Sequence, residues 1–317
     1  MKTRILGNTD LAVYPVTFGG NVFGWTIDEK QSFAILNGFT DAGFNFIDTA
    51  DVYSRWAPGN EGGESERIIG KWMKDRHNRQ DIVLTTKVGS DMGDGKKGLA
   101  KNYILKAVED SLRRLQTDYL DLYQTHFDDP STPVQETLEA YDVLVKQGKV
   151  RWIGASNMSA ERLQESLNTS KALGLPQYQT FQPHYNLYQR ALYEEKIEKI
   201  VTDNHLGVLN YYSLASGFLT GKYRSADDFG KSARGGGMQQ FLNERGFRIL
   251  DTLDAVAKRY DATPATVALA WLIQRPSVTA PIVSATSLSQ LDSIIKAPEL
   301  YLDYDAIADL NAASAGQ

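Results

Sequence analysis

The chain has 317 residues, of which 42% are hydrophobic and 23% are charged, a balance typical of a soluble globular protein with a substantial core. Its 34 basic and 39 acidic side chains leave a formal charge of −5, which argues against nucleic acid or an anionic membrane as a partner. Cysteine is absent, so disulfides, thiolate metal sites and cysteine nucleophiles are excluded.

The first thirteen residues lack an apolar run of signal-peptide length. No stretch of the chain approaches the roughly 20 apolar residues that a membrane-spanning helix requires. We therefore expect a cytoplasmic protein without a membrane partner. Residues Met1–Val13 are predicted to form a β-hairpin that turns at Asn8 and lies over the amino-terminal end of the strands that follow.

Eight short apolar runs follow, and each is succeeded by a segment with helical periodicity. Most of these runs are almost continuous in apolar residues, as is typical of parallel strands that are buried on both faces. The predicted strands are Val16–Gly20, Asn45–Thr49, Ile82–Val88, Leu120–His126, Val150–Ser156, Tyr178–Gln182, Gly207–Tyr212 and Thr279–Val283.

Residues that favour helix ends lie between these runs. Thr263 and Pro264 combine an N-cap threonine with proline at the first helical position, and Thr132–Gln135 repeat this pattern with a capping-box glutamine. Ser159 is expected to cap a helix through Leu167. Helices are expected to end near glycines that can adopt the left-handed conformation, namely Gly43, Gly148 and Gly174.

Eight strand–helix units without a proline-rich or low-complexity linker predict an α/β fold. The architecture that we favour is a (β/α)8 TIM barrel with an N-terminal β-hairpin and C-terminal helices, in a single domain over residues 1–317. A doubly wound sheet is the alternative on pattern alone.

Ionisable side chains fall at the carboxyl ends of three predicted strands, where barrel enzymes carry their chemistry. Asp48 and Tyr53 end or follow the second strand, Lys87 lies in the third, and His126 ends the fourth. Taken singly, such an aspartate is more often a turn or cap residue, and a lone tyrosine or histidine is usually structural. Lys87 differs, because a lysine inside an apolar run is rarely buried without a partner.

These four side chains form a proton-transfer site if they share one barrel mouth. Asp48 would then neutralise Lys87, and Lys87 would favour the phenolate form of Tyr53 by charge attraction. A phenol with an ordinary pKa of about 10 needs such help to release a proton near neutral pH.

Residues 217–237 contain six glycines and four basic residues. This composition suits a mobile flap that approaches a pyrophosphate, and it equally suits a disordered surface loop. Ser287 and Gln290 form a capping-box pattern, and the helix amino terminus that it predicts would offer N–H groups to a phosphate.

Several stretches, in the same order, resemble the aldo-keto reductase family over essentially the whole chain. The resemblance is to the bacterial branch that is similar to potassium-channel β subunits. It rests on Gly43–Tyr53 (GFNFIDTADVY), Thr86-Lys87, Tyr119–His126 (YLDLYQTH), Gly148–Asn157 (GKVRWIGASN) and Leu214–Tyr223 (LASGFLTGKY).

The resemblance implies an enzyme that reduces small aldehydes or ketones with NADP, or with NAD as the alternative cofactor. Its catalytic residues would be Asp48, Tyr53, Lys87 and His126. Tyr53 would protonate the carbonyl oxygen as hydride arrives at carbon. Lys87, held by Asp48, would lower the pKa of Tyr53, and His126 would orient and polarise the carbonyl.

The resemblance also implies a set of cofactor-binding residues. Those expected to bind the nicotinamide half are Ser156, Asn157, Gln182 and Tyr211, with the Tyr211 ring stacked on the nicotinamide. Those expected around the phosphates and the adenosine half are Leu214, Gly217, Lys222, Arg224, Ser284, Thr286 and Gln290. Family members often have glycine in place of Ser284, and many that are specific for NADPH carry a basic residue near Thr286, which this chain lacks.

Two rival interpretations remain. Lys87 could form a Schiff base in another class of barrel enzyme, or the chain could hold a cofactor and regulate a partner protein. A metal hydrolase is disfavoured, because none of the histidines at 77, 126, 184 and 205 are spaced as a pair of ligands.

Three aromatic residues flank the predicted mouth and could build an apolar substrate pocket or pack beneath a loop: Trp25, Trp56 and Phe127.

Overall fold

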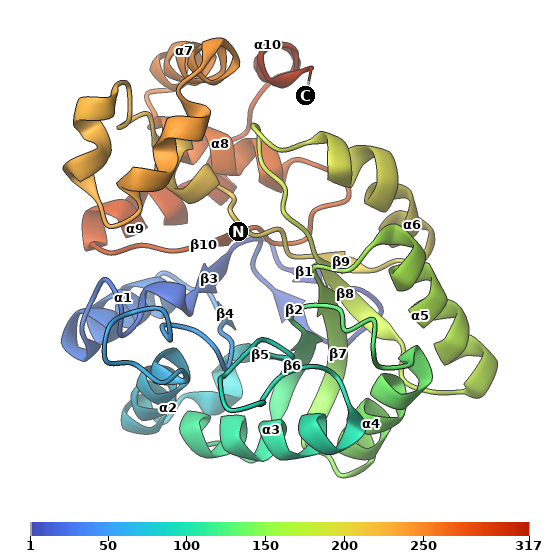
Figure 1. Cartoon of the computed structure of the whole chain (residues 1–317). Helices are drawn as coiled ribbons and strands as arrows, with labels where there is room; N and C mark the ends of the chain where they lie inside the picture. Colours follow the sequence, from blue (N-terminus) through green and yellow to red (C-terminus); the bar gives the residue numbers. More distant parts are fainter. Residues whose placement is uncertain (1, 317) are drawn as a thin grey trace.

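The computed structural model describes residues 2–316 and contains a sheet of eight parallel strands surrounded by helices (Figure 1). Their order in the sheet is β10-β3-β4-β5-β6-β7-β8-β9. The strands are β3 (Thr17–Gly19), β4 (Phe46–Asp48), β5 (Val83–Val88), β6 (Leu120–Thr125), β7 (Val150–Ser156), β8 (Tyr178–Gln182), β9 (Gly207–Val208) and β10 (Ile282–Val283).

Backbone hydrogen bonds join the first and last strands of this sheet. The N–H of Ile282 donates to the carbonyl of Asn210 (2.9 Å), and those of Thr279 and Ala280 donate to the carbonyl of Val208 (3.0 and 3.2 Å). The eight strands therefore curl into the (β/α)8 barrel that the sequence predicts.

Strands β9 and β10 are shorter than predicted, for local reasons. Tyr212, the last residue of the predicted strand Gly207–Tyr212, has a φ of 54° and therefore lies outside the extended region. Pro281, which has no N–H to donate, directly precedes β10. The seam between these two strands is therefore held by a few single hydrogen bonds instead of a regular ladder.

Helices cover the outside of the barrel, and two of them follow β10 at the carboxyl terminus (Figure 1). Around the barrel they are α1 (Glu29–Asp41), α2 (Glu64–Arg76), α3 (Lys101–Leu115), α4 (Val134–Lys146), α5 (Ala160–Leu173), α6 (Glu198–Asp203), α7 (Glu244–Arg259), α8 (Pro264–Ile273), α9 (Leu288–Ile295) and α10 (Tyr304–Ser314).

Most of the predicted helix ends are confirmed. Thr263 caps α8 by accepting from the N–H of Thr266 (3.1 Å), and Ser159 caps α5, which continues to Leu173 instead of ending at Leu167. The expected glycines follow α1, α4 and α5 with φ values of 94°, 72° and 64°: Gly43, Gly148 and Gly174.

The predicted threonine cap of α4 is wrong. Pro133 occupies the N-cap position, and the hydroxyl of Thr132 donates to Asp129 Oδ2 instead (2.6 Å).

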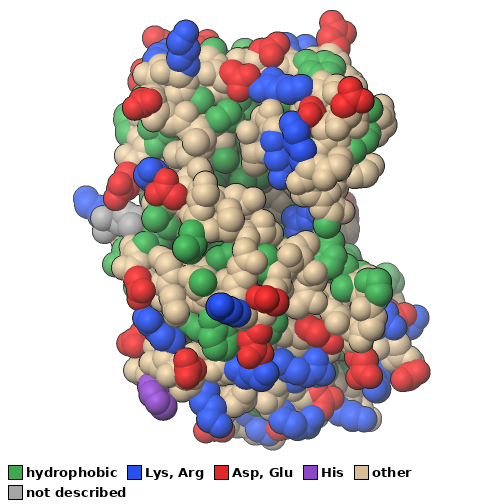
Figure 2. Space-filling view, turned by 90° about the vertical axis from the view of Figure 1, so that its left-hand side faces the viewer, with side chains coloured by type: hydrophobic (Ala, Val, Ile, Leu, Met, Phe, Trp, Pro, Cys, Tyr) green, Lys and Arg blue, Asp and Glu red, His purple; other side chains and the backbone are tan. Residues whose placement is uncertain are grey.

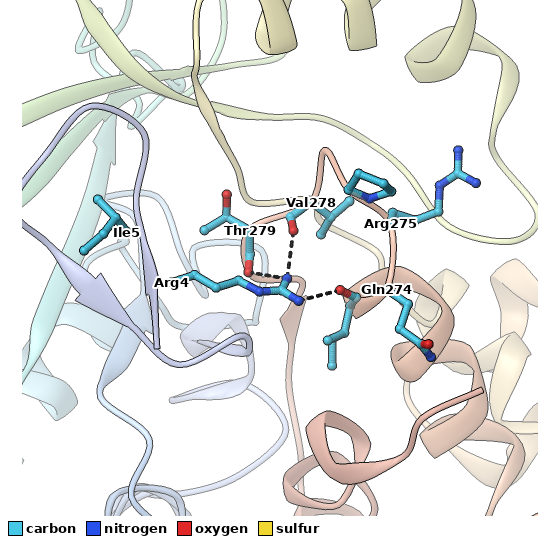
Figure 3. A pocket seen from close by; sticks show the side chains of 8 residues that line it. Arg4, Ile5, Gln274, Arg275, Val278 and Thr279 are labelled. Atoms are coloured by element: carbon cyan, nitrogen blue, oxygen red, sulfur yellow. Dashed lines mark hydrogen bonds between the residues drawn. The ribbon is translucent and has the colours of Figure 1, made fainter. Parts of the chain in front are cut away.

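The amino-terminal hairpin covers one end of the barrel, as predicted. Strands β1 (Arg4–Ile5) and β2 (Ala12–Val13) pair antiparallel, while Met1 lies outside the described residues. The guanidinium of Arg4 donates to the carbonyl of Ile273 at the end of α8 and to two carbonyls of the α8–β10 connection, at 2.7–3.1 Å (Figure 3). The hairpin side chains Leu6, Leu11 and Val13 form one apolar cluster with residues in or next to the barrel strands. These residues are Phe46, Val83, Leu122, Leu209, Ala280 and Ile282.

The recess in Figure 3 thus lies at the amino-terminal end of the strands, away from their carboxyl ends. Within residues 2–316 no helix is both long and apolar enough to cross a membrane.

Candidate active site

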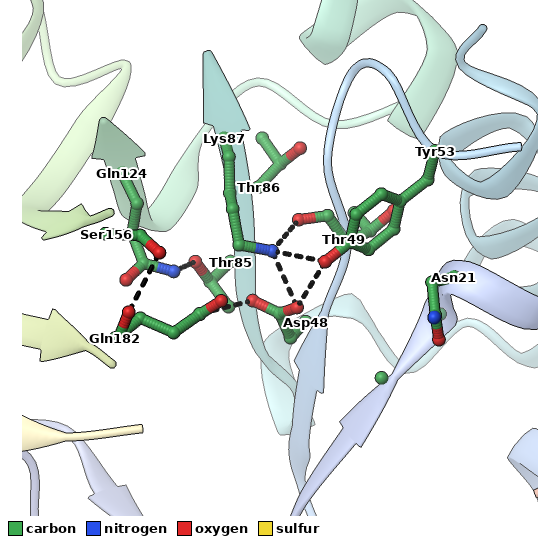
Figure 4. A network of polar contacts seen from close by, with 12 residues as sticks. Asn21, Asp48, Thr49, Tyr53, Thr85, Thr86, Lys87, Gln124, Ser156 and Gln182 are labelled. Atoms are coloured by element: carbon green, nitrogen blue, oxygen red, sulfur yellow. Dashed lines mark hydrogen bonds and ion pairs between the residues drawn. The ribbon is translucent and has the colours of Figure 1, made fainter. Parts of the chain in front are cut away.

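A buried ion pair lies at the carboxyl ends of β4 and β5 (Figure 4). Lys87 Nζ donates to Asp48 Oδ2 (2.7 Å), to the carbonyl of Thr49 (2.9 Å) and to the phenol oxygen of Tyr53 (2.9 Å). The Lys87 and Asp48 side chains are 0% and 1% exposed. All three ammonium hydrogens therefore have acceptors, which makes the burial of a charged lysine tolerable.

Local sequence explains this placement. Strand β5 reads Val-Leu-Thr-Thr-Lys-Val and is buried along its whole length, so Lys87 has no route to solvent. Burial lowers the pKa of Lys87 and raises that of Asp48, while the attraction between their charges opposes both shifts. The pair contributes no net charge to the barrel mouth.

The direction of the Tyr53 pKa differs from the sequence-based expectation. Burial raises the pKa of Tyr53 well above its ordinary value, and the Asp48 carboxylate, 3.3 Å from the phenol oxygen, raises it further. The positive charge of Lys87 alone would lower this pKa, but the paired carboxylate offsets it. The phenol therefore keeps its proton at neutral pH.

His126 lies beside Tyr53 and is buried. The two rings meet edge to face, with centroids 5.9 Å apart, and His126 Nδ1 lies 2.8 Å from Ser90 Oγ. Burial lowers the pKa of His126 well below its ordinary value, and the charge of Lys87 lowers it further. The imidazole is therefore neutral near pH 7. Ser90 was not predicted, because nothing in its sequence context distinguishes it from other loop serines.

The four residues expected at the nicotinamide form one hydrogen-bonded network that reaches the ion pair. Gln182 Nε2 donates to Asp48 Oδ1 (3.1 Å), and Ser156 Oγ donates to the carbonyl of Gln182 (2.9 Å). Asn157 Oδ1 accepts from the phenol of Tyr211 (2.7 Å). These side chains come from the ends of β7 and β8 and from the segment after β9, so the barrel brings all of them to the mouth that holds Lys87.

The Tyr211 ring is held in place by a second, unpredicted aromatic residue. His184 stacks on it with centroids 5.3 Å apart and an interplanar angle of 22°. An isolated parallel bridge joins the backbones of the same two residues. These contacts fix the orientation of the Tyr211 ring, which the resemblance predicts to stack on the nicotinamide.

The glycine-rich segment after β9 places Leu214, Gly217 and Lys222 close together. Ala215, Ser216 and Gly217 have φ values of 47°, 57° and 101°, an unusual run of left-handed residues. A side chain at Gly217 would meet Lys222 Nζ at 3.5 Å. Among residues 2–316 no carboxylate lies within 4.0 Å of the Lys222 ammonium.

Arg224 makes contacts of a different kind from those of Leu214, Gly217 and Lys222. Its guanidinium forms ion pairs with Asp254 (2.5 Å) and Asp251 (3.6 Å) of α7 and donates to the carbonyl of Gly221 (2.9 Å). In this arrangement the side chain anchors the base of the loop to α7.

The three residues expected at the adenosine half lie together at the start of α9. Ser284 Oγ is 2.7 Å from both the carbonyl of Gly19 and Asn21 Oδ1, and Gln290 Oε1 accepts from the N–H of Thr286 (2.9 Å). Ser287 caps α9, as predicted. The Ser284 hydroxyl, which the usual glycine would lack, ties β10 to β3.

The three predicted pocket residues adjoin Tyr53 and His126. Trp25 and Trp56 meet edge to face at 5.5 Å, Trp56 meets Tyr53 at 6.0 Å, and Phe127 stacks on His126 at 4.9 Å. Trp56 and Phe127 are each about half exposed. These rings form an aromatic wall around the phenol.

The chain is similar to known proteins over nearly its whole length. Residues 15–315 match the model of the Aldo/keto reductase family. The "Uncharacterized oxidoreductase YrpG" of Bacillus subtilis is 36% identical, over 98% of this chain and 95% of that protein. The "Aldo-keto reductase YhdN" of the same organism is 33% identical, over 92% of this chain and 86% of that protein. A "Probable voltage-gated potassium channel subunit beta" of Oryza sativa subsp. japonica is 32% identical, over 94% and 91%.

Proposed function

Because the chain belongs to the aldo/keto reductase family, we propose that it is an oxidoreductase that reduces aldehydes or ketones to alcohols with NADP as cofactor and NAD as the alternative. We further propose that one barrel domain, residues 1–317, carries the whole activity. The observation that carries the proposal is the hydrogen bond from buried Lys87 to the Tyr53 phenol, at the end of the barrel where the amide groups also gather.

Tyr53 is the proton donor in this proposal. Its raised pKa keeps the phenol protonated, and the carbonyl oxygen gains basicity as negative charge collects on it in the transition state. Lys87, already within 2.9 Å of the phenol oxygen, stabilises the phenolate that remains after proton transfer. Asp48 holds Lys87 in position through the 2.7 Å ion pair.

His126 orients the carbonyl in its neutral form. If the Ser90 hydroxyl donates to Nδ1, the proton lies on Nε2 and can be donated to the carbonyl oxygen. A neutral imidazole also avoids placing a second cation beside Lys87. Burial and the charge of Lys87 both lower the pKa of His126, which favours this neutral form.

The residues present fit a nicotinamide dinucleotide. The amides of Gln182 and Asn157 and the hydroxyl of Ser156 suit a carboxamide. Lys222, which has no carboxylate partner among residues 2–316, and the left-handed run at residues 215–217 suit a pyrophosphate, and the N-terminus of α9 suits a phosphate. When bound, the cofactor supplies the hydride to the carbonyl carbon. Ser156, Asn157, Gln182 and Tyr211 would hold the nicotinamide half. The other half would contact Leu214, Gly217, Lys222, Ser284, Thr286 and Gln290, with Arg224 holding the loop.

Cofactor binding provides the first test. NADPH titrated into the protein should quench tryptophan fluorescence in a saturable way with a micromolar Kd, and NADH should bind more weakly. A panel of simple aldehydes and ketones should then oxidise the bound NADPH. The proposal fails if neither reduced nicotinamide binds saturably.

The rival roles make different predictions. A Schiff-base enzyme needs a free amine at Lys87, whereas all three Nζ hydrogens have acceptors here, and borohydride should trap no substrate on Lys87. A regulatory role is suggested by the relative named as a potassium channel subunit. The intact Asp48–Lys87–Tyr53 arrangement favours turnover, which a regulatory subunit would not require.

A further inference from the structure

Two further carboxyl groups are buried close to the ion pair of the candidate active site. Asp51 lies in the turn that leads from β4 to Tyr53, and Glu66 lies in the first turn of α2; they are 2% and 0% exposed. On the outer surface that carries α1 and α2, acidic and basic side chains lie interspersed and solvated (Figure 2). Asp51 and Glu66 lie beneath such a surface, so any charge on them must be stabilised by neighbouring protein groups.

Neighbouring donors stabilise a charge on Glu66. Thr86 Oγ1 donates to its Oε1, and Arg114 Nε donates to its Oε2, each at 2.6 Å. Both oxygens therefore accept a hydrogen bond, and one of the two donors is a cation, which is the arrangement that favours a carboxylate over the protonated acid. The charge of Glu66 is balanced by the charge of Arg114.

Asp51 has no such partners. Its Oδ1 is buried without a hydrogen bond, and among residues 2–316 no cationic nitrogen lies within 4.0 Å of its carboxyl group. Burial raises the pKa of Asp51 well above its ordinary value, and the charge of Glu66 raises it further. The charges of Arg114 and Lys87 and the N–H of Val52 oppose this shift only in part. Asp51 is therefore a neutral acid near pH 7.

The other titratable groups that interact with Asp51 supply no second cation. They are phenols from α3, β6 and α4, and burial raises the pKa of each, so they are uncharged near pH 7: Tyr103, Tyr123 and Tyr141. Asp110 of α3 adds a further negative charge near Arg114. Two buried carboxyl groups thus share one guanidinium, and the group with the unpaired oxygen keeps its proton.

Asp51 is joined to the candidate active site through Lys87. The N–H of Asp51 donates to the carbonyl of Lys87 (3.3 Å), and Lys87 Nζ donates to the carbonyl of Thr49 and to the phenol of Tyr53, both at 2.9 Å (Figure 4). The turn that carries Tyr53 is thus tied to both the backbone and the side chain of Lys87. A negative charge on Asp51 acts on the Lys87 ammonium, and it would offset part of the positive potential that stabilises a phenolate at Tyr53.

We propose that Asp51 is a positioning residue for the carbonyl reduction at Tyr53. In its protonated form it holds the turn on Lys87 and leaves the charge of Lys87 undiminished for the phenolate, and its ionisation at alkaline pH slows the reaction. The effect on the rate rests on the proposed function. The protonation of Asp51 does not, because it is a property of the folded chain alone.

Infrared spectroscopy of the whole protein tests the protonation without turnover. A protonated carboxyl group has a C=O stretching band that a carboxylate lacks. The wild-type spectrum at pH 7 minus that of Asp51→Asn should contain this band. The matched control is Asp110→Asn, which removes a partly exposed carboxylate paired with Arg113, and its difference spectrum should lack the band. If both difference spectra lack it, Asp51 is ionised and the inference is wrong.

Stability provides a second measurement that needs no turnover. Asparagine resembles the neutral acid in shape, and it cannot ionise. The folded wild type binds a proton that the unfolded chain has released, so its stability falls as pH rises above the ordinary pKa of aspartate. In urea denaturation, Asp51→Asn should therefore gain stability relative to wild type between about pH 5 and pH 8. A deficit that grows with pH would show that the structure requires the carboxylate, which contradicts the inference.

The effect on the rate is measured as single-turnover reduction of an aldehyde by bound NADPH between about pH 6 and pH 10. The rate of Asp51→Asn divided by the wild-type rate should rise about 10-fold across this range, the change that corresponds to one pKa unit of interaction. A purely structural role of Asp51 would change the rate by the same factor at every pH, so a constant ratio refutes the inference while the proposed function stands. If the infrared band is present but neither protein reduces an aldehyde, the proposed function fails and the neutral acid stands.

Discussion

Replacing Lys87 by methionine tests the energetics of the buried ion pair. Methionine fills a similar volume, so the main loss is the cation that balances Asp48, together with the hydrogen bonds to Thr49 and Tyr53. Breaking a buried ion pair by removing one partner costs about 3–5 kcal/mol, because the remaining charge is uncompensated. Gln182 and Tyr53 still donate to the carboxylate, which favours the lower half of that range.

The loss should depend on pH in a definite direction. Without Lys87, burial raises the pKa of Asp48 further above its unfolded value, so the folded variant binds a proton that the unfolded chain has released. Between the unfolded and folded pKa values, stability therefore falls as pH rises. The deficit relative to wild type should be larger at pH 7 than at pH 4.5.

Urea denaturation followed by circular dichroism at both pH values measures this deficit. Lys71→Met is a suitable control, because its ion pair with Glu29 is about half exposed and should contribute less than about 1 kcal/mol. The double variant Lys87→Met, Asp48→Asn should be more stable at pH 7 than Lys87→Met alone, since it removes the stranded carboxylate. Equal deficits at both pH values, or additive effects of the two substitutions, would refute the reasoning.

Two further substitutions test the proposed roles of the side chains at the mouth. Tyr53→Phe should leave the Kd for NADPH nearly unchanged but slow single-turnover hydride transfer from bound NADPH at least about 100-fold, the lower end expected for losing a general acid; a wild-type rate would show that Tyr53 is not the acid. Ser90→Ala should lower kcat/KM for aldehydes by about 2- to 10-fold through loss of the hydrogen bond to His126 Nδ1, with rescue by Ser90→Thr. A purely structural role of Ser90 would instead lower thermal stability and leave the kinetics unchanged.

The barrel was predictable because its signals are local. Each strand is a short apolar run, and caps such as Thr263 and Ser159 act within one helical turn. The grouping of Asp48, Lys87 and Tyr53 was also predictable, since all barrel strands end on the same face. A lysine in a wholly buried strand requires a partner, and Asp48 was the acidic residue at the neighbouring strand end.

Features that depend on tertiary surroundings could not be predicted in the same way. The sign of the Tyr53 pKa shift depends on how deeply the phenol is buried and on its distance to Asp48, neither of which sequence spacing gives. Ser90 and His184 become notable only once the fold places them against His126 and Tyr211. The sequence singled out the basic, glycine-rich segment 217–237, but which of its cations pairs with a carboxylate is a property of the folded loop, in which Arg224 pairs with Asp254 and Lys231 with Asp228.

The barrel strands are unevenly paired, with more residue pairs around β6 than around β9 and β10. Four or five residue pairs join β5 to β6 and β6 to β7, whereas two join β8 to β9 and two join β10 to β3. Fluctuations that open the sheet should therefore start beside β9 and β10, where the glycine-rich segment leaves the barrel and α9 begins. Lys87 lies on the densely paired strand β5 and His126 directly follows β6, while Asp48 lies on β4, which forms two residue pairs with β3 and three with β5. The barrel can thus open beside β9 and β10 to admit or release a long ligand while Lys87 and His126 keep their positions.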